Sequence, residues 1–137
     1  MIDLTGKTAL ITGGSRGIGR ATAVLMAKAG ADVAVGYQSN EAAAEAVLAE
    51  IEGLGRRCLP LKADISKRDE VRAAVDKMAA EFGRIDILVN NAGIWTYLEI
   101  GSGDAAAWRE TMAVNLDSVY FFTDAVIPYM KKQGSGR

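Results

Sequence analysis

The chain has 137 residues, half of them hydrophobic, and its formal net charge at pH 7 is −1. This length allows one domain with a sizeable core, and this hydrophobicity excludes an intrinsically disordered chain. Because both signs of charge are interspersed, we expect neither a nucleic-acid partner nor a polybasic membrane contact. No apolar run approaches the ~18 residues of a membrane span and none resembles a secretory signal, so we expect a cytoplasmic protein.

Two residue types limit the possible chemistry. The sequence has no histidine, which excludes Ser-His-Asp catalysis, Cys-His catalysis and histidine metal sites within this chain, and we expect no metal site. Its one cysteine, Cys58, excludes an internal disulfide. Cys58 lies in a short apolar run that predicts a strand, so we interpret it as a small buried side chain rather than a reactive thiol.

The hydrophobic pattern alternates along the chain between short apolar runs and segments with helical spacing. The apolar runs predict strands at residues 7–12, 32–37, 57–63 and 85–90. The other segments predict helices at residues 20–29, 41–54, 66–82 and 104–132. Ser66 and Asp69 form a capping-box pattern at the start of the third helix, and Pro128 can interrupt the last helix near its end.

This alternation with short connections predicts an α/β fold, a Rossmann-type doubly wound parallel sheet with helices on both faces. For a dinucleotide-binding half of such a sheet, the strand order is 3-2-1-4 and the ligand binds at the carboxyl ends of the strands. We interpret residues 1–137 as one nucleotide-binding domain in which the later strands of the sheet are missing, with 134–137 as a flexible end.

A glycine-rich turn, Thr-Gly-Gly-Ser-Arg-Gly-Ile-Gly at 12–19, connects the first strand to the first helix. Such a turn brings backbone N–H groups and the positive end of a helix dipole to one point, which suits a diphosphate. Gly13 can take the turn, Gly17 lets the backbone approach a phosphate, and Gly19 lets the helix pack close to the strand. The alternative is a plain glycine-rich turn in an α/β domain.

The spacing of these glycines resembles the short-chain dehydrogenase/reductase family, whose motif T-G-x-x-x-G-I-G this chain matches at every fixed position. The N-N-A-G motif of the family is matched by residues 90–93, at the end of the fourth predicted strand. The chain is most similar to members of the 3-oxoacyl-carrier-protein reductase type. The resemblance covers the whole chain, which in turn covers the first half of the family's domain. It implies a small-molecule carbonyl or alcohol substrate and a homo-oligomer.

The resemblance also implies the cofactor-binding residues. They are Gly13, Ser15, Arg16, Gly17, Ile18, Gly19, Tyr37, Gln38, Ser39, Asp64, Ile65, Asn91, Ala92 and Gly93. Asp64 would accept the adenine amino group, and Ile65 would lend a backbone contact; a helix-start acid is the other interpretation of Asp64. Asn115 is the candidate catalytic residue, because the family places an asparagine on this helix to hold a water in a proton relay. An exposed polar position is the alternative for Asn115.

The cofactor expected from these residues is NADP rather than NAD. A carboxylate after the second strand would bind the ribose 2′-hydroxyl and repel a 2′-phosphate, but residues 37–40 contain none before Glu41. Arg16 adds a cation with several donors beside the expected phosphates, although a solvated loop charge is the alternative.

The family's catalytic Tyr-x-x-x-Lys pair does not occur in this chain, because none of its four tyrosines is followed by lysine at that spacing. In the family that tyrosine is the general acid/base. We therefore expect the intact protein to be an oxidoreductase that transfers hydride between NADP(H) and a carbonyl or alcohol. Residues 1–137 would supply the cofactor-binding half and be inactive alone. The alternative is a nucleotide-binding or assembly module without catalysis of its own.

Overall fold

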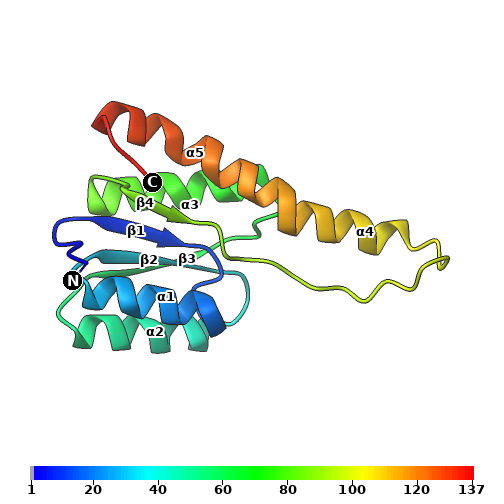
Figure 1. Cartoon of the computed structure of the whole chain (residues 1–137), viewed down its shortest axis with the longest axis horizontal. Coiled ribbons are helices and arrows are strands. Elements are labelled where there is room, and N and C mark those ends of the chain that lie inside the picture. The colour runs from blue at the N-terminus through cyan, green and yellow to red at the C-terminus, as the bar shows by residue number, and fades with distance from the viewer. Residues whose placement is uncertain (1) are drawn as a thin grey trace.

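The computed structural model describes residues 2–137, in which strands and helices alternate as the sequence predicts (Figure 1). The strands are β1 (Thr8–Ile11), β2 (Asp32–Tyr37), β3 (Cys58–Lys62) and β4 (Ile87–Val89). The helices are α1 (Gly17–Lys28), α2 (Glu41–Gly53), α3 (Arg68–Phe82), α4 (Ala105–Met112), the π-helical η1 (Ala113–Asp117) and α5 (Ser118–Gln133). Within residues 2–137, no helix is both long enough and apolar enough to cross a bilayer.

The four strands form one sheet in the order β3-β2-β1-β4, with every neighbouring pair parallel. Ala9 of β1 lies opposite Val33 of β2 and Ile87 of β4, which sets the register of these three strands. The predicted α/β class and strand order are therefore confirmed. Because all strands run the same way, their carboxyl ends meet at one edge of the sheet.

Helices cover both faces of the sheet, so alternate residues of β1 enter different cores. Ile11 packs in the core beneath α1 and α2, whereas Leu10 packs in the core beneath α3 and α5 (Figure 1). Both side chains are fully buried. A strand buried on both faces needs apolar residues at every position, which explains the continuous apolar runs in the sequence.

Buried carboxylates fix the amino ends of two strands. Asp32, at the start of β2, accepts hydrogen bonds from Arg56 Nη2 at 2.6 Å and Arg57 Nε at 2.7 Å. Asp86, just before β4, accepts from Arg84 Nε at 2.7 Å and from the backbone N–H of Thr8 at 3.0 Å. These ion pairs lie at the amino ends of the strands, opposite the carboxyl edge. They stabilise the fold and do not contribute to a site at the carboxyl edge.

Two local predictions about the helices are wrong. Ser66 does not cap α3, since its hydroxyl donates to Asp64 Oδ1 at 2.7 Å and the helix begins after Lys67, which makes no side-chain cap bond. Pro128 does not interrupt α5, which continues to Gln133. The irregular turn of this helical segment lies earlier, in η1.

The two edges of the sheet differ. At the β4 edge, Arg137 N donates to Asp86 O at 2.9 Å and Arg137 O accepts from Leu88 N at 2.9 Å, as in a parallel ladder. The end of the chain at 134–137, which we expected to be flexible, is thereby hydrogen-bonded to the sheet. At the other edge, β3 pairs only with β2 among the described strands, and Pro60 lies at its centre.

Candidate functional site

A pocket lies at the carboxyl edge of the sheet. It is lined by the glycine turn (13 and 15–19), the end of β2 and the loop after it (36–40), Ala63, Ile65, the turn after β4 (91–94) and Val114 of η1. The structure therefore brings together all the predicted cofactor-binding residues except Asp64.

Five lining residues were absent from our prediction, namely Gly36, Asn40, Ala63, Ile94 and Val114. Each of them is next in the sequence to a residue that we predicted for the site. A glycine such as Gly36 at the end of a buried strand is a signal for a close approach of two backbones, and it was available in the sequence. A Cβ on Gly36 would lie 3.3 Å from the Cα of Thr12.

The glycines of the turn have different surroundings. A Cβ on Gly13 would lie 2.9 Å from the Cα of Ala92, and a Cβ on Gly19 would overlap the carbonyl oxygen of Gly13. These two glycines allow the turn, α1 and the turn after β4 to pack in direct contact. Gly17 has a φ of +54° and no atom within 4 Å of the position of a Cβ, so its backbone is open to a ligand.

The start of α1 is prepared for an anion. Asn40 caps α2 by accepting from Ala43 N at 3.0 Å, and Asp104 caps α4 by accepting from Ala107 N at 2.9 Å. The starts of α1 and α3 lack a side-chain cap bond, but the first turn of α3 contains Asp69 and Glu70, whereas the first turn of α1 contains no acidic residue. Because the first backbone N–H groups of a helix have no intrahelical acceptor, this end fits the negative oxygens of a phosphate.

The glycine turn and the turn after β4 are locked together by Thr12 and Asn91. The Thr12 hydroxyl oxygen accepts from the backbone N–H groups of Asn91 and Ala92, both at 2.9 Å. In return, Asn91 Nδ2 donates to the carbonyl oxygens of Thr12 at 2.9 Å and Gly13 at 3.2 Å. Thr12 is 2 % exposed, and the bonds that it makes with the turn after β4 are partly buried. They give the pocket a fixed floor where β1 and β4 end.

Asn115 lies in η1 and holds the chain that leaves β4. Its Oδ1 accepts from Ile94 N at 2.8 Å, and its Nδ2 donates to Ile94 O at 2.8 Å. Asn115 itself does not line the pocket, although its neighbour Val114 and its partner Ile94 do. Asn115 therefore ties the loop after β4 to η1 through two hydrogen bonds. The water-holding role of Asn115 stays a prediction.

Asp64 faces away from the pocket, toward the start of α3. Its Oδ1 accepts from Ser66 N at 3.1 Å and from Ser66 Oγ at 2.7 Å, and its Oδ2 lies 3.5 Å from Lys67 Nζ. The hydrogen bond from the Ser66 side chain is the main cause that holds the pKa of Asp64 below its ordinary value. These contacts close the turn before α3, and the adenine contact of Asp64 stays a prediction.

The remaining reactive groups give no sign of a second chemistry. Cys58 packs against the core beneath α1 and α2, where burial, aided by the charge of Glu52, raises the pKa of its thiol to about 12. Its thiolate is therefore scarce at neutral pH, in agreement with a structural role. Between residues 2 and 137, no group of three or more Cys, Asp or Glu side chains is placed to hold a metal ion.

The chain matches known proteins over nearly all its length. The family model described as short chain dehydrogenase matches residues 7–137. The chain is 41% identical over 137 residues to the 3-oxoacyl-[acyl-carrier-protein] reductase of Synechocystis sp., covering 100% of this chain and 56% of the relative. It is 39% identical over 133 residues to the L-rhamnose 1-dehydrogenase (NAD(P)(+)) of Sphingomonas sp., covering 97% of this chain and 52% of that relative.

A solved structure agrees with these matches. The crystal structure of a short chain dehydrogenase from Burkholderia cenocepacia in complex with NADP has a TM-score of 0.90 and 44% identity, covering 92% of this chain and 51% of that one. The chain thus spans about half the length of the curated relatives and of this structure.

Proposed function

Because the chain belongs to the short chain dehydrogenase family, we propose that the whole protein is an oxidoreductase that transfers hydride between NADP(H) and a small carbonyl or alcohol substrate. Residues 1–137 would bind and orient the cofactor, which supplies the hydride when bound. The observation that carries the proposal is the uncapped start of α1, opening on a pocket whose floor is fixed by Thr12 and Asn91. That arrangement suits the diphosphate of a dinucleotide.

The preference for NADP is supported by the charges around the pocket. Arg16 lines it and makes no ion pair with any residue of 2–137, so its guanidinium is available to an added phosphate. The lining at 36–40 offers the amide of Gln38 and the hydroxyl of Ser39, and it contains no carboxylate. A 2′-phosphate would therefore meet donors and no like charge.

We expect the whole protein to bind NADPH more tightly than NADH, as measured by isothermal titration calorimetry. Tyr37→Asp should reverse this preference, because like charges near a protein surface repel by roughly 1–4 kcal/mol at contact distance. Tyr37→Phe is the matched control, since it keeps the ring and adds no charge, and it should keep the wild-type preference. Equal or tighter binding of NADH by the wild type would contradict the proposal.

Residues 1–137 expressed alone are expected not to turn over substrate, because they contain no Tyr-x-x-x-Lys pair to donate the proton. They should also self-associate, since apolar side chains are exposed on the segment from α4 to α5. These are Trp108, Leu116, Val119, Tyr120 and Ile127. In the whole protein, the same face supports our proposal of a homo-oligomer.

An NADPH-oxidation assay with a panel of ketones and aldehydes, together with light scattering, tests both expectations. Monomeric residues 1–137 that reduce a ketone would contradict them. A whole protein that binds NADPH but reduces no carbonyl would favour the alternative of a nucleotide-binding module without catalysis of its own.

A further inference from the structure

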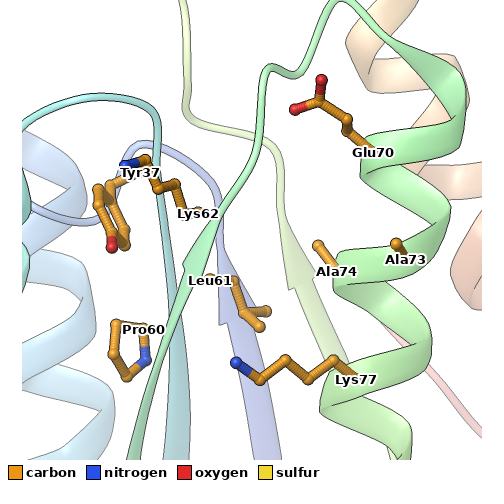
Figure 2. A pocket seen from close by; sticks show the side chains of 8 residues that line it. All are labelled: Tyr37, Pro60, Leu61, Lys62, Glu70, Ala73, Ala74 and Lys77. Carbon is orange, nitrogen blue, oxygen red and sulfur yellow. The ribbon is translucent and has the colours of Figure 1, made fainter.

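One wall of the cofactor pocket is held from outside by α3. The loop from β3 to α3 contributes Ala63 and Ile65 to the pocket, while Asp64 between them faces α3. The backbone N–H of Asp64 donates to Glu70 Oε2 at 2.8 Å. Figure 2 shows the Glu70 side chain extending from the first turn of α3 toward the loop that leaves β3. The pocket drawn in Figure 2, which Glu70 lines, lies between β3 and α3 and is not the cofactor pocket; Glu70 does not line the cofactor pocket.

Every polar group of Asp64 is engaged on this outer side. Its carbonyl oxygen accepts from Lys67 N at 3.0 Å, and its carboxylate binds Ser66 and Lys67 as described above. Lys67 Nζ also lies 3.3 Å from Glu70 Oε1. These contacts hold Asp64 on the side of the loop that faces α3. Glu70 is the member of the network that belongs to α3, whereas Asp64, Ser66 and Lys67 precede the helix.

We infer that Glu70 is a positioning residue for the adenine end of the cofactor site: it holds the backbone of Asp64 so that Ile65 forms the wall of the pocket. The inference rests on the proposed function, because the adenine contacts that the family resemblance implies for Asp64 and Ile65 exist only if this pocket binds NADP. It adds a residue that lines no part of the cofactor pocket and lies in the first turn of the helix that follows the loop. Without its acceptor, the Asp64 N–H would have to turn to water, and the loop would sample other conformations.

The test compares three variants of the whole protein. Glu70→Ala removes the acceptor, and Glu70→Gln retains an oxygen that can accept from Asp64 N but loses the charge. Asp69→Ala is the matched control, because Asp69 is the other acidic residue in the first turn of α3 and is exposed, with no bond to the loop in the described structure. Asp69→Ala, like Glu70→Ala, removes one negative charge from the first turn of α3, so the two variants change the helix dipole interaction equally.

The first measurement is the affinity for adenosine 2′,5′-bisphosphate, which represents the adenine end alone. Glu70→Ala should weaken binding by about tenfold, close to the lower end of the range for a hydrogen bond to a charged group, because this bond is exposed. Glu70→Gln should weaken it by less than about threefold, and Asp69→Ala should leave it unchanged. At saturating NADPH, kcat should be the same in all four proteins, so that only KM for the cofactor changes.

The second measurement is amide hydrogen exchange at residues 64–66 without ligand. Exchange should accelerate in Glu70→Ala and not in Asp69→Ala. Equal losses of affinity in these two variants, or unchanged affinity in Glu70→Ala, would overturn the inference. So would an equal loss for reduced nicotinamide mononucleotide, which has no adenine. If the wild type binds neither NADPH nor the bisphosphate, the proposed function fails and this inference with it.

Discussion

Replacing Thr12 by valine is expected to lower the free energy of unfolding by about 2–6 kcal/mol. The substitution keeps the shape of the side chain but removes the oxygen that accepts from both Asn91 N and Ala92 N. A buried donor left without a partner costs about 1–3 kcal/mol. The two bonds are partly buried and Thr12 is 2 % exposed, so the lower part of the range applies if water reaches the two N–H groups. The turn after β4 would also lose its fixed distance from the glycine turn, so cofactor affinity should fall in parallel.

Thr12→Ser is the matched control, because it retains the hydroxyl and loses only one methyl group. It should destabilise the protein by about 1 kcal/mol, roughly the contribution of one buried methyl group. Urea denaturation followed by circular dichroism gives both values, provided that the slope of the transition stays the same. Equal stabilities of the valine and serine variants would show that the two N–H groups find other acceptors.

Gly19→Ala is expected to destabilise the protein by about 3 kcal/mol or more, at the upper end of the range for overpacking. The new Cβ would overlap the carbonyl oxygen of Gly13 and lie 2.5 Å from Asn91 Nδ2. One obstacle is backbone, and the other is an amide already held by two carbonyls. The clash could be relieved only by moving α1 away from β1, which would also displace the N–H groups that face the pocket.

Gly53→Ala provides the control for Gly19→Ala. It adds the same methyl group to a helix, but no atom lies within 4 Å of the new Cβ and the φ of Gly53 is not positive. Alanine is favoured over glycine in a helix by up to about 1 kcal/mol, so this variant should be unchanged or slightly more stable. Thermal unfolding and NADPH titration of both variants would measure the difference. A Gly19→Ala variant that unfolds and binds like the wild type would refute the packing assigned to Gly19.

The fold was predictable because β1 and β2 are buried along nearly their whole length, and α1, α2, α3 and α5 each bury one face. β2 occupies residues 32–37 as predicted, since its apolar run is bounded by Gly30 and by polar residues. The fourth strand was predicted too long, at 85–90. Gln133 holds Ile85 through two bonds to its backbone, and β4 pairs with β1 only from Ile87 to Val89. Such tertiary contacts shorten a strand without a local signal in the sequence.

The position of the pocket was also predictable, because glycine turns and strand ends are local features. The bonds that shape it were not. Thr12 and Asn91 are 79 positions apart, and Asn115 and Ile94 are 21 apart, so only the folded chain shows that they meet. The capping pattern at Ser66 failed because its hydroxyl donates to the charged carboxylate of Asp64 instead of capping α3. No residue pattern in the sequence predicted the π-helical turn that contains Asn115.

Pro60 at the centre of β3 has a consequence for the behaviour of the protein at high concentration. Because the backbone groups of Arg57 and Ala63 bond to β2, the two-residue alternation turns Pro60 away from β2, toward the outer edge. That edge therefore lacks an N–H at its midpoint, and the charged Lys62 follows two positions later. A strand from another molecule could not continue an unbroken ladder there, so cross-β stacking and fibril growth are obstructed on this side of the sheet.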